Sequence, residues 1–135
     1  MIRIKRIDDF PKEFKAEWKA SNKRMGFGHY SKNFYFGAFE GKRLVGYTHI
    51  KVNGGVGELK ELIIKRGSLG NGYGKMMLNH FVKFCKAKKC HKLTLETSER
   101  HKEARKLYEK HGFRIESRKP DDKYHLTWYW YSKRL

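Results

Sequence analysis

The chain has 135 residues, 39% hydrophobic and 15% aromatic, which suits one globular domain with a single core. Its 32 Lys and Arg against 14 Asp and Glu give a formal net charge of +18, an excess that attracts polyanions such as nucleic acid, acidic proteins or a phosphorylated cofactor. No apolar run approaches the ~20 residues of a membrane span and the N-terminus lacks the apolar segment of a secretory signal, so we expect a cytoplasmic protein without membrane association.

The basic residues are spread along the whole chain, so charge alone does not locate a binding face. A lysine-rich surface that serves only solubility and stability is the alternative interpretation. Two cysteines, Cys85 and Cys90, are too few for a disulfide scaffold and are interpreted as free thiols. With His91 they match no standard zinc spacing, and we expect no metal site.

The N-terminal segment predicts a strand and then a helix. Residues 2–7 alternate apolar and basic with period two, which is typical of a half-buried strand. A helix is expected over residues 10–20, with Asp9 as its N-cap and Pro11 in its first turn. Its buried face would be an aromatic stripe with a spacing of four, made of Phe10, Phe14 and Trp18.

Three antiparallel strands are expected next. Residues 34–39 and 44–50 are aromatic and β-branched runs separated by EGKR, which indicates a hairpin. A turn at residues 53–55 leads into a third strand over residues 56–64, which ends in a fully apolar tip.

The second half of the chain predicts two helices and three strands. Helical spacing of apolar residues from Gly72 to about Lys88 predicts a long amphipathic helix, and residues 91–97 alternate as a strand. Ser98 is expected to cap the next helix and Gly112 to end it. The remaining segments are a helix over 99–111, strands over 113–117 and 125–132, and a turn at 119–122.

These elements give the order β-α-β-β-β-α-β-α-β-β. The chain shows no repeat, no low-complexity segment and no linker. We therefore expect one mixed α/β domain over residues 1–135.

A glycine run, RGSLGNGYGKMM at residues 66–77, joins the apolar strand tip to the long helix. Glycines at a helix N-terminus allow the backbone to close around an anion, because unpaired N–H groups converge there. A Walker A pattern fails at Leu69 and Met76, and a G-x-G-x-x-G pattern starting at Gly70 fails at Lys75. A loop that only needs to bend is the alternative.

Two motifs in this part of the chain resemble one family. Residues 69–74, LGNGYG, resemble the Q/R-x-x-G-x-G/A loop of the GCN5-related N-acetyltransferase (GNAT) superfamily, and ARKLYEKHGF at residues 104–113 is similar to its A-x-x-L-Y-E-K-x-G-F element. The matching positions of the second motif are Ala104, Leu107, Tyr108, Glu109, Lys110, Gly112 and Phe113. The resemblance implies the GNAT fold, a mostly antiparallel twisted sheet of about six or seven strands that splays around the cofactor and is flanked by helices.

The resemblance also implies a reaction and a co-substrate, the transfer of an acetyl group from acetyl-CoA to an amine. Backbone groups of Leu62, Ile63 and Ile64 would bind the pantetheine arm. The pyrophosphate would lie against the loop residues Leu69, Gly70, Asn71, Gly72, Tyr73, Gly74 and Lys75, with Arg66 adding charge. Leu69 departs from the pattern, because a leucine cannot supply the side-chain contact of about 1.5–3 kcal/mol expected from Gln or Arg.

By the same resemblance, Tyr108 would protonate the leaving thiolate, and a glutamate would serve as base. Glu58 and Glu61 are the candidates, and they point to opposite faces of a regular strand unless a bulge intervenes. Glu58 ranks first, because it lies eleven positions before Leu69, as the catalytic glutamate does in the histone-acetylating branch. His101 stands where many relatives have an asparagine that touches the cofactor. Packing for Tyr108 and surface exposure for the glutamates are the alternatives.

The acceptor would be an amine on a protein or a small molecule. Residues 23–33 and the aromatic run of Trp128, Tyr129 and Trp130 are the candidate acceptor segments, although part of them must fill the core. The positive charge favours an acidic or nucleic-acid-associated carrier. The alternative is a non-catalytic protein that has the same fold and binds acetyl-CoA or nucleic acid. The sequence is compatible with both a monomer and a homodimer.

Overall fold

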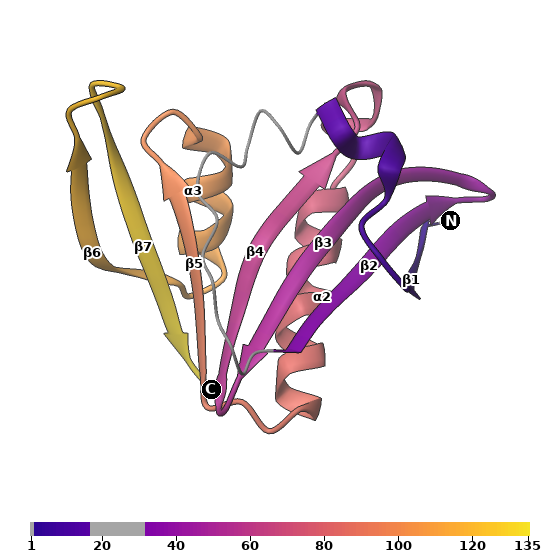
Figure 1. Cartoon of the computed structure of the whole chain (residues 1–135), viewed down its shortest axis with the longest axis horizontal. Helices are drawn as coiled ribbons and strands as arrows, with labels where there is room; N and C mark the ends of the chain where they lie inside the picture. The colour runs from indigo at the N-terminus through magenta and orange to yellow at the C-terminus, as the bar shows by residue number, and fades with distance from the viewer. Residues whose placement is uncertain (1, 17–31) are drawn as a thin grey trace.

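A computed structural model describes residues 2–16 and 32–135 of the chain. In these ranges it contains a seven-stranded sheet, two longer helices and two short 3-10 helices (Figure 1). The strands are β1 (Ile2–Ile7), β2 (Lys32–Glu40), β3 (Arg43–Asn53), β4 (Val56–Ile64), β5 (Lys92–Ser98), β6 (Arg114–Asp121) and β7 (Leu126–Arg134). The helical segments are η1 (Lys12–Phe14), η2 (Arg66–Ser68), α2 (Tyr73–Ala87) and α3 (Lys102–Lys110).

The strand order in the sheet is β1-β2-β3-β4-β5-β7-β6. Every neighbouring pair is antiparallel except β4 and β5, which are parallel. The β4–β5 pairing is also short, since it extends only from Val56↔Lys92 to Leu59↔Leu95. Beyond that point the two strands diverge, which Figure 1 shows as two arrows that separate toward their tips. The sheet therefore consists of two wings that meet along a few residues.

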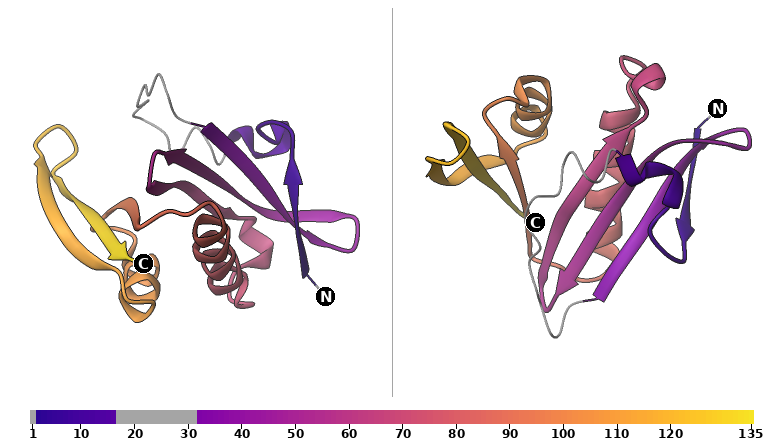
Figure 2. Two further views of the ribbon diagram at one scale, coloured as in Figure 1. Left: turned by 90° about the horizontal axis from the view of Figure 1, so that it is seen from below. Right: turned by 45° about the horizontal axis from the view of Figure 1, so that its top comes forward.

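The two faces of the sheet have separate cores. Helices α2 and α3 lie on one face and η1 lies on the other (Figure 2). The larger core packs α2 against the sheet, with Leu78 and Phe81 of α2 fully buried beside Leu59 and Leu93. Across the sheet, Phe14 of η1 packs edge-on against the ring of Tyr47, with 5.0 Å between ring centroids.

The expected strands and the long second helix are confirmed. The segments expected as strands over residues 2–7, 34–39, 44–50, 56–64 and 91–97 form β1 to β5. The helix predicted from Gly72 to about Lys88 is α2, with Gly72 at its N-cap. Gly112 follows the C-cap of α3 with φ +87°, and the N–H of Phe113 donates to the carbonyl oxygen of Tyr108 at 3.0 Å. Gly112 therefore ends α3 as the sequence predicts.

The predicted cap at the first helix is wrong. The helical segment begins at Lys12 after Pro11, and the Asp9 carboxylate accepts the N–H of the adjacent Phe10 at 2.7 Å instead of a helix N–H. Helical backbone continues to residue 16, and the predicted extension to residue 20, including Trp18, lies outside the described residues.

Ser98 does not cap the third helix either. It is the last residue of β5, paired with Trp128, and this pairing keeps its backbone extended. Its hydroxyl accepts the N–H of Arg100 at 3.3 Å, and α3 begins only at Lys102 with His101 at the N-cap.

The turn between the last two strands also falls later than predicted. β6 continues through Pro120 and Asp121, which pair with Thr127 and Leu126, and the turn occupies residues 122–125. A proline fits in β6 because that strand is at the edge of the sheet, where one of its sides needs no N–H donor.

Gly57 provides a test of how closely α2 approaches β4. A Cβ at this position would overlap Sγ of Cys85 and lie 3.2 Å from Cδ2 of Leu93. We expect Gly57→Ala to lower the free energy of unfolding by about 1–3 kcal/mol, as overpacking does in other cores, in urea denaturation followed by circular dichroism. The control is Gly67→Ala, where a Cβ meets nothing within 4 Å, and equal stability of the two variants would contradict this packing.

Candidate functional site

A β-bulge in β4 decides which way its carboxylates point. Opposite β3, His49 pairs with Glu61 but Ile50 pairs with Leu59, so Lys60 is an extra residue on β4. The side chain of Leu59 lies in the core beneath α2, so the adjacent Glu58 projects to the opposite face. Glu61 projects to that same face. A regular strand would have placed Glu58 and Glu61 on opposite faces, and the bulge brings them to one.

The bulge coincides with the end of the β4–β5 pairing. Leu62, Ile63 and Ile64 pair on one side with Thr48, Tyr47 and Gly46 of β3. Within the described ranges, no strand pairs with the other side of these three residues. This free backbone edge, residues 62–64, can accept hydrogen bonds from an extended, peptide-like arm.

The glycine run follows this edge and leads into α2. Gly70 and Gly72 have φ values of +81° and +76°, which favour glycine, and no heavy atom would lie within 4 Å of a Cβ at either residue. The first turn of α2 contains no acidic residue, and its first helical bond is from Met76 N–H to the Gly72 carbonyl. The N–H groups ahead of Met76 therefore have no partner within the helix. An uncrowded loop whose N–H groups have no partner within the helix fits a pyrophosphate.

The side chains of this loop differ in what they can contribute. Leu69 is 62% exposed and offers no donor, whereas Lys75 and Arg66 are exposed cations. The Asn71 side chain donates to the Ser68 carbonyl at 3.2 Å and so braces the loop. The Tyr73 hydroxyl donates to Glu40 at 2.5 Å, which raises the pKa of Tyr73 and directs its side chain toward β2.

Tyr108 lies in α3 on the α2 side of the sheet. Burial raises the pKa of Tyr108 to about 12, with a smaller contribution from Tyr131, so its phenol stays protonated at neutral pH. Its ring packs against Phe113 and Tyr131, with centroid distances of 6.3 and 6.1 Å. Its hydroxyl forms no hydrogen bond with another residue in the described ranges. The exposed His101 lies about two turns earlier, at the N-cap of α3.

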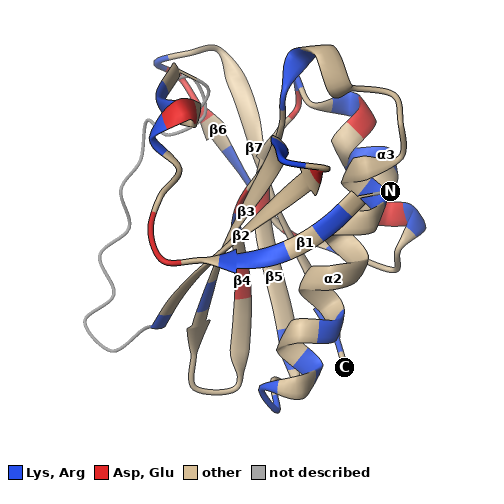
Figure 3. Cartoon of the chain, turned by 90° about the vertical axis from the view of Figure 1, so that its right-hand side faces the viewer, with Lys and Arg blue, Asp and Glu red and all other residues tan. Residues whose placement is uncertain are grey.

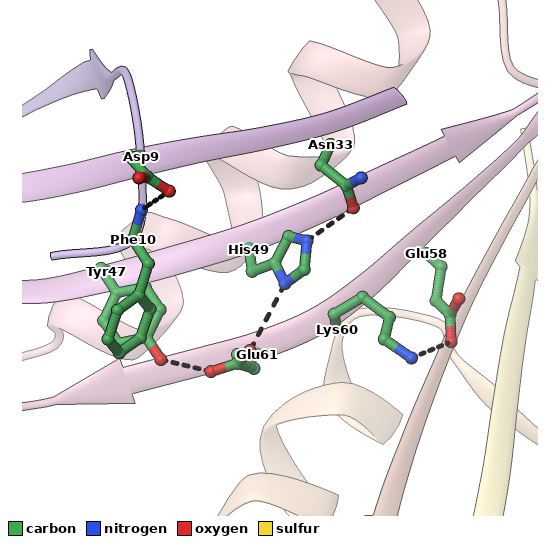
Figure 4. Close-up of polar contacts among 8 residues, drawn as sticks. All are labelled: Asp9, Phe10, Asn33, Tyr47, His49, Glu58, Lys60 and Glu61. Atoms are coloured by element: carbon green, nitrogen blue, oxygen red, sulfur yellow. Dashed lines mark hydrogen bonds and ion pairs between the residues drawn. The ribbon is translucent and has the colours of Figure 1, made fainter. Parts of the chain in front are cut away.

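Glu61 lies in a polar cluster that spans three strands (Figure 4). The carboxylate accepts a hydrogen bond from the Tyr47 hydroxyl, and its other oxygen lies 3.3 Å from Nδ1 of His49. Nε2 of His49 lies 2.8 Å from Oδ1 of Asn33, and the ring of Tyr35 stacks on the imidazole at 4.5 Å. The side chain of Glu61 is only 6% exposed, whereas that of Glu58 is 25% exposed and its Oε2 lies 3.7 Å from Nζ of Lys60.

Sequence reasoning missed this cluster. Tyr47 and His49 were interpreted only as strand residues, although their spacing of two places them on one face of β3. This spacing could have shown from the sequence that the two side chains share one face of the sheet. Their partner Glu61 could be aligned with them only after the bulge was known.

The candidate acceptor segments are only partly described. Of residues 23–33, Lys32 and Asn33 begin β2 and the remainder lie outside the described residues. In β7, the indole of Trp128 donates to Asp121 at 3.0 Å, and the guanidinium of Arg105 lies 3.8 Å from the ring centre of Tyr129. These contacts give part of the aromatic run a structural role.

Across the described ranges, no cluster of three His, Cys, Asp or Glu side chains is arranged to hold a metal ion. Cys85 and Cys90 are both buried free thiols. No helix in those ranges is long and apolar enough to cross a membrane.

Comparison with known proteins identifies the family. The model of the Acetyltransferase (GNAT) family matches residues 3–113. The chain belongs to this family. The expected GNAT fold is thereby confirmed, and family membership supports acetyl transfer as the general activity. A search of curated proteins found no match.

Solved GNAT structures share the fold at low sequence identity. The IAA acetyltransferase from Bacillus cereus ATCC 14579 has a TM-score of 0.80 at 20% identity, with 100% of both chains covered. A GNAT acetyltransferase from Elizabethkingia anophelis with acetyl-CoA bound has a TM-score of 0.77 at 16% identity, covering 99% of this chain and 98% of that one. The ribosomal-protein-S18-alanine N-acetyltransferase from Escherichia coli has a TM-score of 0.79 at 15% identity, covering 100% and 94%. The expected co-substrate, acetyl-CoA, is thus bound in a protein of this fold.

Because Leu69 is exposed and offers no donor, we expect its substitution by arginine to increase the affinity for the cofactor. Leu69→Arg should tighten acetyl-CoA binding by about tenfold, because one charge-assisted hydrogen bond contributes about 1.5 kcal/mol or more. Isothermal titration calorimetry measures the change. Leu135→Arg adds the same charge at the exposed C-terminal residue and is the control. Equal affinity of the two variants would mean that the side chain at position 69 does not reach the cofactor.

Proposed function

We propose that the protein transfers the acetyl group of acetyl-CoA to a primary amine. The observation that carries the proposal is the free edge of β4 at residues 62–64, which leads directly into an uncrowded glycine loop at the N-terminus of α2. A peptide-like arm and a pyrophosphate are the two parts of coenzyme A that such neighbouring features suit. Family membership supports the same reaction.

The residues proposed to hold acetyl-CoA divide into three groups. Backbone groups of Leu62, Ile63 and Ile64 bind the pantetheine arm. The pyrophosphate lies against the backbone of residues 69–75, with Lys75 adding charge. His101, exposed at the N-cap of α3, is proposed as a donor to the cofactor. Acetyl-CoA supplies an activated acyl group, and the chain supplies its orientation and the proton transfers.

Tyr108 is proposed as the general acid. Because burial raises its pKa to about 12, the phenol keeps its proton throughout the physiological range. An unbonded hydroxyl on a helix fixed to β7 can donate that proton to the departing sulfur. Two hydrogen bonds fix α3 to β7: Nε of Arg105 donates to the Tyr131 hydroxyl at 2.9 Å, and that hydroxyl donates to Glu109 at 2.8 Å.

A glutamate of β4 is proposed as the general base. Spacing along the chain ranks Glu58 first, but Glu58 pairs with Thr94, where β4 and β5 are still joined, and lies beside Lys60. Glu61 lies past the bulge, on the same part of β4 as the free edge. We therefore assign the base to Glu61. It projects to the face opposite α2, so the amine would approach from that face.

The acceptor is proposed to be an amine on a protein or small molecule in the cytoplasm, with an acidic or nucleic-acid-associated carrier favoured by charge. Lys and Arg occur along β1 and toward the C-terminal end of α2 (Figure 3), and the net charge is +18. The E. coli relative that acetylates an alanine of ribosomal protein S18 makes a protein N-terminus a suitable first acceptor to test. The protein would act as a monomer or homodimer.

The same charge favours a second candidate, a non-catalytic protein that binds acetyl-CoA or nucleic acid. An acceptor panel of N-terminal peptides, lysine peptides, spermidine and an aminoglycoside separates the two. Amine-dependent release of thiol from acetyl-CoA supports the enzyme. No release with any amine, together with salt-sensitive RNA binding, supports the binding protein.

Tyr108→Phe tests the acid. Loss of the phenolic proton should lower kcat by about 100-fold with little change in acetyl-CoA affinity, within the 10²–10⁴ range of positioned proton transfer. Thiol release measures kcat, and calorimetry measures affinity. Because the pKa of Tyr108 is raised to about 12, the wild-type rate should show no fall due to this group between pH 7 and about pH 10. An unchanged kcat in the variant would mean that Tyr108 only packs in the core and is not the general acid.

Glu61→Gln and Glu58→Gln test the base as a matched pair. Each removes a carboxylate and keeps the shape. Glu61→Gln should lower kcat by about 100-fold, and Glu58→Gln should have a clearly smaller effect. The reverse order would assign the base to Glu58, as chain spacing predicts.

A further inference from the structure

The acidic residues of the chain are distributed less evenly than the basic ones. No Asp or Glu occurs between Glu61 and Glu96, a stretch that contains the glycine loop and all of α2. The C-terminal part of α2 and the residues after it carry exposed lysines instead, namely Lys83, Lys86, Lys88 and Lys89. Lys83 and Lys86 are three positions apart on the helix, where neighbouring like charges cost stability. Positive charge is therefore concentrated at this end of α2 and is not neutralised by residues of the helix itself.

Strand β1 adds to this charge through a shared aromatic ring. Ile4 of β1 packs against the core beneath α2, and Arg6 follows two positions later on the same face of the strand. The guanidinium of Arg6 lies 5.0 Å from the ring centre of Phe34, and Nζ of Lys88 lies 5.1 Å from the same centre. Cation–π contacts with Phe34 thus bring together two exposed cations that are far apart in the sequence.

These cations have no carboxylate partners. Lysines of other segments do, since Nζ of Lys65 lies 3.3 Å from Glu13 and Nζ of Lys92 lies 2.6 Å from Glu116. Within residues 2–16 and 32–135, no ion pair involves the five residues that we call the basic surface: Arg6, Lys83, Lys86, Lys88 and Lys89. The dipole of α2 favours cations at its C-terminal end, but it does not account for a cation on β1. Figure 3 shows the cations of β1 and of this end of α2 on one side of the molecule.

We propose that the basic surface docks the phosphate backbone of RNA. A protein partner fits less well, because protein interfaces have an apolar core and contain few lysines. The large apolar side chains exposed in the described ranges, Leu69, Met76 and Leu135, are not part of this surface. Lysine and arginine side chains are instead the usual donors to phosphate oxygens.

The shape of the surface also favours RNA. Helix α2 lies along the face of the sheet (Figure 2), so it cannot enter a groove to contact bases. Double-stranded RNA is recognised mostly by its shape and by contacts with its phosphates and 2′-hydroxyl groups. RNA is also the abundant polyphosphate of the cytoplasm, where we expect the protein to act.

The basic surface lies away from the proposed coenzyme A site. Lys83 follows Gly72 by eleven positions, which corresponds to about 16 Å along a helix that rises 1.5 Å per residue. RNA and coenzyme A would therefore bind at opposite ends of α2 without competition. Docking would hold the enzyme close to an acceptor on an RNA-associated carrier, and this role rests on the proposed acetyl transfer.

Fluorescence anisotropy with a labelled RNA duplex of about 16 base pairs tests the surface. Lys83→Gln/Lys86→Gln/Lys88→Gln should weaken RNA binding about 10- to 100-fold at about 0.1 M KCl. The slope of log K against log salt concentration should become less steep by about 3, one for each lost phosphate contact. If circular dichroism shows that the triple variant is misfolded, Lys83→Gln/Lys86→Gln replaces it, with an expected change in slope of about 2. Saturating coenzyme A should leave the RNA affinity unchanged.

The matched control removes the same charge from exposed lysines on the other wing of the sheet. Lys110→Gln/Lys119→Gln/Lys123→Gln should lose clearly less RNA affinity. Equal losses in the two triple variants, or displacement of RNA by coenzyme A, would overturn the proposal. So would competition by polyglutamate as effective as that by unlabelled RNA, or tighter binding of a DNA duplex of the same sequence.

The RNA assay and the acetyl-transfer assay can fail separately. Acetyl transfer by a protein that binds no RNA would overturn the docking surface alone. RNA binding with the expected response to the two triple variants, but without amine-dependent thiol release, would support the surface and contradict the proposed function.

Discussion

The extra residue at Lys60 is the constraint on which the rest of the candidate site depends. A bulged strand bends, and this one bends immediately after Leu59, the last residue of β4 that pairs with β5. The bend leaves the backbone of residues 62–64 unpaired on one side. It also turns Glu61 to the face opposite α2. One backbone irregularity thus provides both a binding edge and the direction of a carboxylate.

The proposed acid and base receive their properties from different wings of the sheet. Tyr108 is fixed on the β5–β7 wing, where burial keeps its phenol protonated. Glu61 belongs to the β1–β4 wing, where hydroxyl and imidazole groups surround its carboxylate. The phenol is thus buried beside aromatic rings, and the carboxylate lies among hydrogen-bonding groups. The glycine loop at the start of α2 would position the cofactor beside the point where the wings separate.

Much of the fold follows from local patterns in the sequence. Period-two alternation and aromatic or β-branched runs between turns predicted the strands, and the spacing of apolar residues from Gly72 predicted α2. The errors fall where tertiary pairing overrides a local signal. Ser98 is held in β5 by Trp128, and Pro120 is accommodated because β6 is an edge strand.

The site was less predictable than the fold. The resemblance of residues 69–74 and 104–113 to GNAT motifs located the loop and Tyr108. Short-range patterns could not show that His49 pairs with Glu61, because that register depends on one extra residue in β4. The partners of Glu61 are therefore tertiary information.

The central claim is that residues 62–64 and the glycine loop hold coenzyme A, and backbone amide NMR with added coenzyme A tests it most directly. We predict that the amide signals of Leu62, Ile63 and Ile64 and of residues 70–75 shift most and become protected from hydrogen exchange. Changes centred instead on β1 or on the C-terminal end of α2, or no changes at all, would contradict the account.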